Sequence, residues 1–101
     1  MPLAVVIVEA VPDAIHGSLS RWLMQVSPST YVGHLSQRVR EQLWEEIEPI
    51  LKDGRATAVF PDENEQGYSV WCAGASRLVP LDLDGLTVMA RLSSNETVTT
   101  P

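Results

Sequence analysis

The stretch Leu3-Ala-Val-Val-Ile-Val8 decides the fold, because an unbroken run of apolar, mostly β-branched residues is typical of a strand inside a sheet. Without polar alternation, the run fits a central strand covered on both faces. It is far shorter than the ~20 residues needed to cross a bilayer. No basic segment precedes it, as a secretory signal would require, so we expect a cytoplasmic protein without a membrane anchor.

A first amphipathic helix is predicted after this strand. Its apolar residues recur at helical spacing up to the helix-ending segment Ser27-Pro-Ser29. Gly17 lies inside the pattern and costs up to ~1 kcal/mol relative to alanine, which indicates a close backbone approach there. The predicted inward stripe consists of Ile15, Leu19, Trp22, Leu23 and Val26.

A second helix is predicted to begin at the capping residue Ser36, with Leu35 packing back on it. Pro49 removes one backbone hydrogen bond, so we expect a kink or a broken last turn before Gly54. The predicted inward stripe is Val39, Leu43, Ile47, Ile50 and Leu51.

Short strands complete the predicted fold. Residues 30–33 form one, residues 56–60 and 68–72 form a hairpin around the polar stretch 62–67, and residues 86–92 form the last, after an irregular segment 73–84. This order predicts an α+β fold, with two helices on one face of a mostly antiparallel sheet. The other face, carrying residues such as Val70 or Trp71, then needs a cover, and a second copy is the simplest one.

The composition fits one domain over residues 1–92, followed by a polar tail, 93–101, that we expect to be mobile. The chain has 7 Lys and Arg against 13 Asp and Glu, a formal net charge of −6. That is the wrong sign for gripping nucleic acid by bulk electrostatics. Contact with DNA or RNA must therefore be local, or shared with a basic partner.

Signature motifs of cofactor-binding proteins and hydrolases are absent from the sequence. Glu9 directly follows the first strand, where an oxygen ligand could help to hold Mg²⁺. Alternatively, it is a helix-capping or solvated acid. One carboxylate binds Mg²⁺ poorly, but two copies of Glu9 across a dimer axis would bind it better.

His16 and His34 are conceivable acids or bases, but neither has a nucleophile arranged with it, and surface or capping roles are more common. The lone cysteine, Cys72, is interpreted as a small apolar side chain without a catalytic role. Most arginines are expected in solvent or paired with a neighbouring acid.

The loop Gly74-Ala-Ser76-Arg77 is different, because small residues, a hydroxyl and a guanidinium suit a phosphate. Acidic residues gather in two other places. These are Asp62, Glu63 and Glu65 in the hairpin turn, and Asp82 and Asp84 before the last strand. They form either a solvated face or a docking surface for a basic partner.

The chain from about Leu3 to Leu92 resembles one family, CRISPR-associated protein 2 in its subtype I-E form. The resemblance rests on several motifs taken together. They are Val8-Glu-Ala-Val-Pro12, Arg21-Trp-Leu23, Tyr31-Val-Gly33, Ser36-Gln-Arg-Val-Arg-Glu-Gln-Leu-Trp44 and Val79-Pro-Leu-Asp-Leu-Asp-Gly-Leu86.

The resemblance implies a ferredoxin-like homodimer in which the last strand of each chain joins the partner's sheet. Some family members are Mg²⁺-dependent nucleases for RNA or double-stranded DNA, and Glu9 matches their acid after the first strand. The I-E form resembles a scaffold instead. Its dimer bridges two dimers of the integrase, CRISPR-associated protein 1, and holds duplex protospacer DNA during spacer acquisition. A third hypothesis is a general protein adaptor that does not bind nucleic acid.

The resemblance also assigns candidate residues. Arg77 keeps the first of two DNA-holding arginines, while Leu78 replaces the second, and the first helix carries fewer basic residues than the family pattern. DNA binding by the chain alone is therefore expected to be weak and to decrease with salt. The DNA-binding candidates are Ser76, Arg77, His16 and Arg21, and the candidates for integrase contact are Glu65, Asp82 and Asp84.

Overall fold

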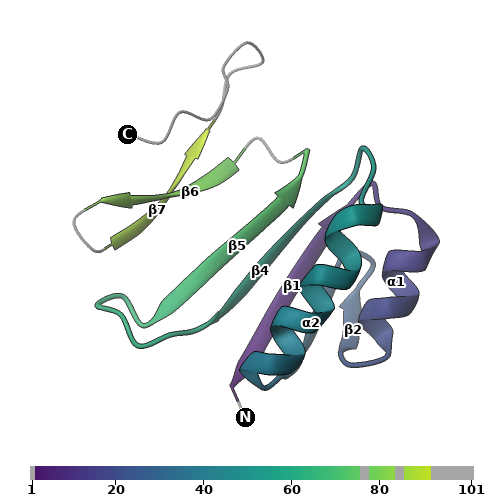
Figure 1. Cartoon of the computed structure of the whole chain (residues 1–101), viewed down its shortest axis with the longest axis horizontal. Helices are drawn as coiled ribbons and strands as arrows, with labels where there is room; N and C mark the ends of the chain where they lie inside the picture. The colour runs from purple at the N-terminus through teal and green to yellow at the C-terminus, as the bar shows by residue number, and fades with distance from the viewer. Residues whose placement is uncertain (1, 76–77, 84–85, 92–101) are drawn as a thin grey trace.

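A computed structural model describes residues 2–75, 78–83 and 86–91 of the chain (Figure 1). The elements follow in the order β1 (Leu3–Glu9), α1 (Asp13–Ser20), β2 (Met24–Ser27), β3 (Thr30–His34), α2 (Gln37–Ile47), a short 3-10 helix η1 (Glu48–Ile50), β4 (Arg55–Pro61), β5 (Tyr68–Gly74), β6 (Leu78–Leu83) and β7 (Leu86–Arg91).

Five strands form one antiparallel sheet in the order β2-β3-β1-β4-β5, and β6 and β7 form a separate hairpin. Both α-helices lie on one face of the larger sheet (Figure 1). This confirms the predicted α+β class, and the arrangement is consistent with a ferredoxin-like fold. β1 is central, as its apolar run predicted.

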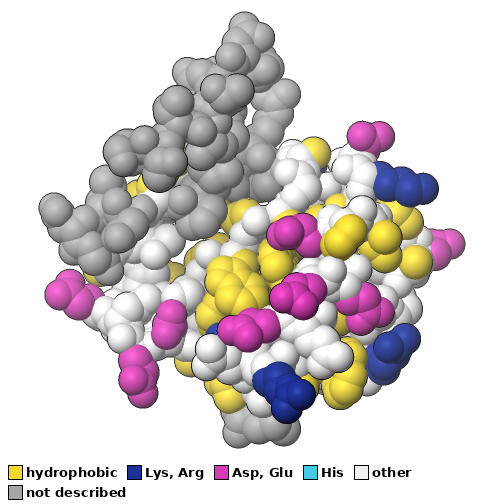
Figure 2. Space-filling view, in the orientation of Figure 1, with side chains coloured by type: hydrophobic (Ala, Val, Ile, Leu, Met, Phe, Trp, Pro, Cys, Tyr) yellow, Lys and Arg dark blue, Asp and Glu magenta, His cyan; other side chains and the backbone are white. Residues whose placement is uncertain are grey.

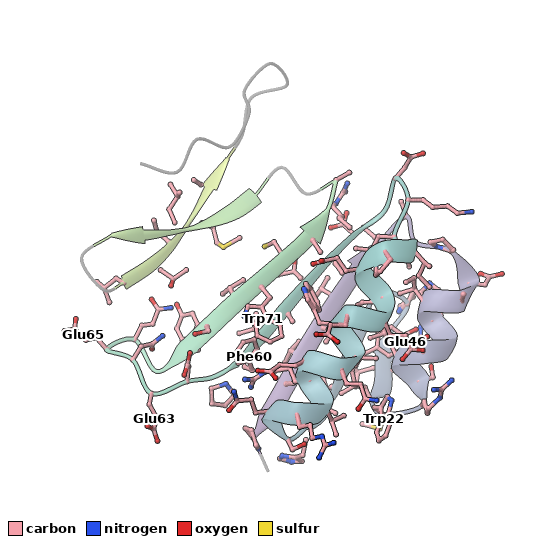
Figure 3. The ribbon with its side chains drawn as sticks, viewed as in Figure 1. Trp22, Glu46, Phe60, Glu63, Glu65 and Trp71 are labelled. Atoms are coloured by element: carbon pink, nitrogen blue, oxygen red, sulfur yellow. The ribbon has the colours of Figure 1, made fainter. Side chains whose placement is uncertain are left out.

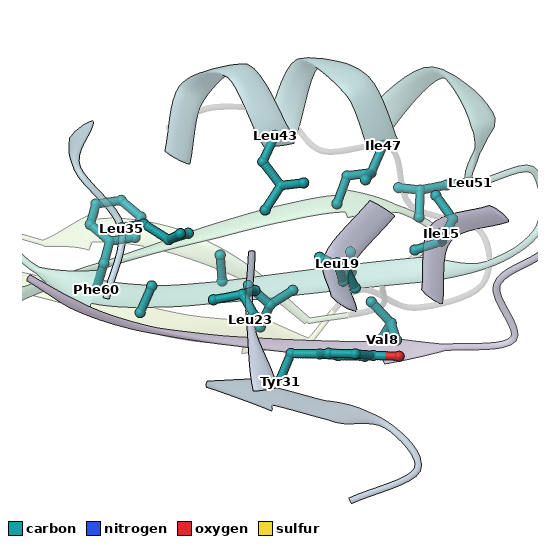
Figure 4. Packing of buried hydrophobic residues seen from close by; sticks show 14 residues of the cluster. Val8, Ile15, Leu19, Leu23, Tyr31, Leu35, Leu43, Ile47, Leu51 and Phe60 are labelled. Atoms are coloured by element: carbon teal, nitrogen blue, oxygen red, sulfur yellow. The ribbon is translucent and has the colours of Figure 1, made fainter. Parts of the chain in front are cut away.

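The core lies between the sheet and the helices (Figure 4). Alternate residues of β1 point into it, and these are Ala4, Val6 and Val8. Helix residues such as Leu19 and Ile47 are fully buried against them. Each buried aliphatic side chain of this size contributes about 1.5–3 kcal/mol relative to an exposed one, so this layer accounts for the placement of both helices.

The opposite face of the sheet is not covered by the described chain, which corrects the prediction that β1 is buried on both faces. Leu3 and Ile7 are 44% and 37% exposed, and Met24 on β2 is 67% exposed. β-Branched residues suit a strand whether or not its second face is covered, so the run alone could not separate these cases. We call this surface the open sheet face and define it by Leu3, Ile7, Met24 and their cross-strand neighbours.

The first helix is shorter than predicted, because α1 ends at Ser20 and residues 24–27 form β2. Trp22 and Val26 are therefore exposed rather than part of the inward stripe, whereas Leu23 is buried as expected. Backbone pairing of Met24 with Val32 of β3 holds this segment extended and overrides its helical spacing. The expected backbone approach at Gly17 is also wrong, because a Cβ there would meet nothing within 4 Å.

The second helix follows the prediction closely. The Ser36 hydroxyl accepts a hydrogen bond from the Val39 amide at 3.3 Å, and Leu35 is buried. α2 ends at Ile47, and Pro49 lies in η1, which is the broken last turn that the proline predicted. One member of the stripe differs, since Ile50 is 38% exposed in η1.

Two predictions in the second half of the chain are wrong. Residues 73–84 are not irregular throughout, because β5 continues to Gly74 and β6 runs from Leu78 to Leu83. Trp71 is not on the open sheet face but contacts Phe60 and Trp44 on the helix side. Strand alternation places Val70 opposite to it. The polar tail 93–101 lies outside the described residues.

The helices of the described chain are too short to cross a bilayer, since α1 and α2 have 8 and 11 residues.

Candidate functional site

Three strands align at one end of the sheet and bring Glu9 opposite Arg55 and Arg55 opposite Gly74. The Arg55 guanidinium donates a hydrogen bond through Nη2 to Oε2 of Glu9. Both side chains are substantially exposed, at 41% for Arg55 and 53% for Glu9. The predicted metal-binding acid is therefore one half of a surface ion pair.

The ion pair changes the titration of both groups. The hydrogen bond from Arg55, and then its positive charge, hold the pKa of the Glu9 carboxyl below its ordinary value. The same contact raises the pKa of Arg55. Glu9 is thus ionised at neutral pH, with Arg55 beside it to balance part of its charge.

The backbone at this end of the sheet is tightly packed. Ala10 has a left-handed conformation, with φ of 56°, directly after Glu9. A Cβ on Gly54 would lie only 2.6 Å from the Ala10 carbonyl oxygen, so only glycine fits there. The Ala75 amide donates to the Gly54 carbonyl at 3.0 Å. The loop with the predicted phosphate ligands therefore begins beside the Glu9–Arg55 pair, while Ser76 and Arg77 themselves lie outside the described residues.

The donor set at Glu9 does not fit Mg²⁺ in a single protomer. Within residues 2–75, 78–83 and 86–91, no group of three or more His, Cys, Asp or Glu residues could hold a metal ion. Mg²⁺ requires near-octahedral oxygen ligands, and the described chain offers here one carboxylate that already bonds a guanidinium.

The two DNA-binding candidates near α1 have different surroundings. His16 is partly buried, and its Nδ1 lies 2.5 Å from the hydroxyl of the buried Tyr31, so β3 fixes the imidazole and only Nε2 is left for a ligand. Arg21 follows α1 and is exposed, in the wall of a small cavity that Glu46 of α2 also lines. Figure 3 shows Glu46 in this region near Trp22. These candidates are separate from the Glu9 end of β1.

The turn between β4 and β5 carries exposed acids on a backbone that hydrogen bonds of the Asn64 side chain hold together. We call Asp62, Glu63 and Glu65 the acidic turn. Asn64 closes it by accepting from the Gly67 amide at 2.8 Å and donating to the Tyr68 carbonyl at 2.9 Å. Glu63 and Glu65 extend outward from it (Figure 3).

Hydrogen bonds connect the acidic turn and its neighbour Gln66 to strand β5 and to the β6–β7 hairpin. The Ser69 hydroxyl donates to Asp62, and this bond, followed by one from the Glu63 amide, lowers the pKa of Asp62. The Thr87 amide donates to Oε1 of Gln66 at 2.7 Å, which ties β7 to the turn. Asp82 lies in β6 opposite Thr87, and Asp84 lies outside the described residues.

Arg55 is a member of this candidate site that the sequence alone does not indicate. Arg55 begins a strand directly after Gly54, and Glu9 ends another strand. Opposite charges at two strand ends are the only sequence feature that hints at this ion pair. Only the register between β1 and β4 makes them neighbours, and that register comes from the packing of the whole sheet.

Residues 3–88 match the model of a family described as CRISPR-associated protein (Cas_Cas2CT1978).

Proposed function

This chain belongs to the CRISPR-associated protein 2 family, and from that premise we propose that it is a non-catalytic scaffold of CRISPR adaptation in its subtype I-E form. As a homodimer, it bridges dimers of the integrase, CRISPR-associated protein 1, and holds the duplex protospacer during spacer acquisition. The observation that carries the scaffold role is the ion pair between Glu9 and Arg55.

The ion pair favours a scaffold over a nuclease for a chemical reason. Arg55 already balances part of the charge that a magnesium ion would use, so the ion must compete with a fixed guanidinium. The competing hypothesis is a Mg²⁺-dependent endonuclease for RNA or double-stranded DNA that uses Glu9 from both protomers. In that case the ion binds Glu9 through Oε1 beside the Arg55 contact, or displaces Arg55 from Oε2.

The open sheet face supports the homodimer. Leu3, Ile7 and Met24 expose apolar surface that a soluble protein rarely leaves uncovered as a continuous patch. Within the described chain, β6 and β7 pair only with each other. Their outer edges are therefore available to the sheet of a second copy.

The net charge supports DNA binding by the chain together with a basic partner protein. With a formal net charge of −6, the chain needs a basic partner to approach a duplex closely. The acidic turn offers Glu65 on a fixed backbone for basic integrase residues, and Asp82 and Asp84 are the further candidates of this kind. Arg77 is the proposed phosphate ligand.

The deciding experiment is reconstituted integration with the integrase, a short duplex and a repeat-containing plasmid, comparing the wild type with Glu9→Gln. The scaffold predicts that integration is retained, because Glu9 performs no chemistry. Nuclease assays on RNA and duplex DNA with Mg²⁺ run in parallel, using an Arg55→Gln variant to separate loss of the ion pair from loss of the carboxylate. Integration that disappears in a folded Glu9→Gln dimer would overturn the scaffold.

The partner contacts are tested by co-purification with the integrase. Charge reversal at Glu65 and Asp84 is expected to abolish the complex, whereas Glu48→Lys/Asp53→Lys, an equal charge change at two exposed positions after α2, should leave it intact. Complex formation that is indifferent to the reversal at Glu65 and Asp84 removes the proposed interface. In the assembled complex, Arg77→Ala should weaken duplex capture and reduce its salt dependence.

A further inference from the structure

An open groove of about 430 Å³ lies between α2 and β5 on the helix side of the sheet. Figure 2 shows it as apolar surface flanked by acidic side chains. None of the predicted site residues that the structure describes contributes to its lining. The described residues that line it are Glu41, Trp44, Glu45, Val70, Trp71 and Cys72.

Two indole rings form the aromatic part of the groove. Trp44 of α2 and Trp71 of β5 contact each other with ring centroids 5.8 Å apart at 55°. Trp71 also packs edge-on against the buried Phe60, with centroids 4.6 Å apart, which fixes its orientation. Both tryptophans are only partly buried, so the groove keeps a rigid aromatic surface exposed to a ligand.

Two carboxylates stand beside these rings. Glu41 and Glu45 are exposed and lie three residues before and one residue after Trp44 on α2, on the same side of the helix as the groove. Among the described lining residues, they are the only charged ones, and both are negative. Glu41 accepts one bond from Gln37, at 3.1 Å, which leaves further acceptor capacity.

The same aromatic cluster already holds one guanidinium of the chain. Arg40 lies 3.7 Å above the Phe60 ring centroid and 5.1 Å from that of Trp71. Its Nε atom is buried and has no hydrogen-bond partner among the described residues, so ring faces provide the contact there. Arg40 is not among the residues that line the groove, which leaves the groove side of Trp44 and Trp71 available.

We propose that this groove binds a basic segment of a partner protein, with an arginine or lysine side chain lying on Trp44 and Trp71 and its charge facing Glu41 and Glu45. Aromatic faces and carboxylates attract the same ligand, a cation, and guanidinium also stacks on indole. Strand alternation turns the Val70 and Cys72 side chains away from the helix side, so the aliphatic stem of the bound side chain lies on the two indole rings. The groove is open rather than enclosed, so it suits a chain segment laid across the surface.

The interaction can be measured on the chain alone by tryptophan fluorescence. A Trp22→Phe background removes the exposed indole outside the groove, so that emission comes from Trp44 and Trp71. The probe is a blocked pentapeptide, Ala-Leu-Arg-Leu-Ala, titrated at low ionic strength to millimolar concentration. The same peptide with glutamine in place of arginine is the neutral comparison.

The arginine peptide is expected to change the emission saturably and to bind at least about fivefold more tightly than the glutamine peptide. The double variant Glu41→Gln/Glu45→Gln should weaken arginine-peptide binding about fivefold or more. Its matched control is Glu48→Gln/Asp53→Asn, which removes the same charge from exposed positions after α2 and should bind like the wild type. Circular dichroism verifies that all variants remain folded.

Equal affinity for the two peptides would overturn the proposal, as would the absence of a saturable change. Equal weakening by both double variants would show a response to net charge rather than to the groove, and would also overturn it. No integrase or DNA is present in this experiment. Its failure is therefore distinct from failure of the proposed scaffold function.

Discussion

Gly74 and Gly54 pass so closely that a Cβ atom on Gly74 would overlap the carbonyl oxygen of Gly54. Gly74 also has a left-handed φ of 83°, which side chains rarely adopt. This contact lies between the end of β5 and the start of β4, at the end of the sheet that carries Glu9 and Arg55. The backbone there fixes where the loop with Arg77 begins.

Gly74→Ala should therefore destabilise the fold by about 2 kcal/mol or more, because both the dihedral angle and the backbone contact are violated. The matched control is Gly67→Ala, where φ is 86° but a Cβ would meet nothing within 4 Å. The control should cost only about 1 kcal/mol, the strain of the dihedral angle. Urea unfolding measures both, and equal losses would contradict the role of the Gly54 contact.

Gly17→Ala should do the opposite and stabilise the protein. Gly17 lies inside α1, and a Cβ there has free space, so alanine gains up to ~1 kcal/mol of helix propensity. For a domain of this size, that corresponds to a rise in melting temperature of about 4–8 °C. Calorimetry checks it, and an unchanged or lower melting temperature would contradict the prediction.

The sequence was sufficient to predict the elements whose signals are local. Ser36 predicted the start of α2, Pro49 predicted its broken last turn, and the apolar run predicted a central β1. In each case the residue type has one dominant physical effect, such as capping or removal of a backbone donor.

The features that the sequence did not predict depend on pairing between distant segments. Residues 24–27 have helical spacing but pair with β3, and the contact of Trp71 with Phe60 reverses the face expected for it. The ion pair of Glu9 with Arg55 joins residues 46 positions apart. Such contacts follow from sheet register, which no single segment specifies.

Ser69→Ala should alter how stability depends on pH. The bond from Ser69 and the Glu63 amide hold the pKa of Asp62 below its unfolded value, so Asp62 contributes stability above the unfolded pKa of about 4. That contribution is lost as pH falls through the lower, folded pKa. At neutral pH, the urea midpoint of unfolding should be higher for the wild type than for Ser69→Ala. This difference in midpoint should disappear in acid. Ser20→Ala, at the exposed end of α1, is the control. A difference that persists unchanged in acid would argue against Asp62 as its source.

Ile7→Asp should convert the proposed dimer to monomer. Ile7 lies on the open sheet face between Thr30 and Thr57, so a charge there would be buried against a second copy at a cost of several kcal/mol. Met24 lies on the same face and is more exposed to solvent, so Met24→Asp is a second variant that should disturb folding less. Sedimentation gives the oligomeric state, and Gln42→Asp on α2 should remain dimeric. A monomeric wild type at micromolar concentration would remove the dimer altogether.

Arg55→Gln isolates what the ion pair does to Glu9. Without the guanidinium, the pKa of the Glu9 carboxyl should rise toward its ordinary value, because the hydrogen bond and the charge that lower it are both lost. Carbon-13 NMR of the carboxyl group follows this titration directly, and Arg55→Lys should retain part of the shift because it keeps the charge but not the guanidinium geometry. If Arg55 competes with Mg²⁺, titration with the ion should perturb the Glu9 signal more in Arg55→Gln than in the wild type. Equal perturbation in both proteins would mean that Arg55 does not hinder Mg²⁺ binding. The ion pair would then no longer favour the scaffold over the nuclease.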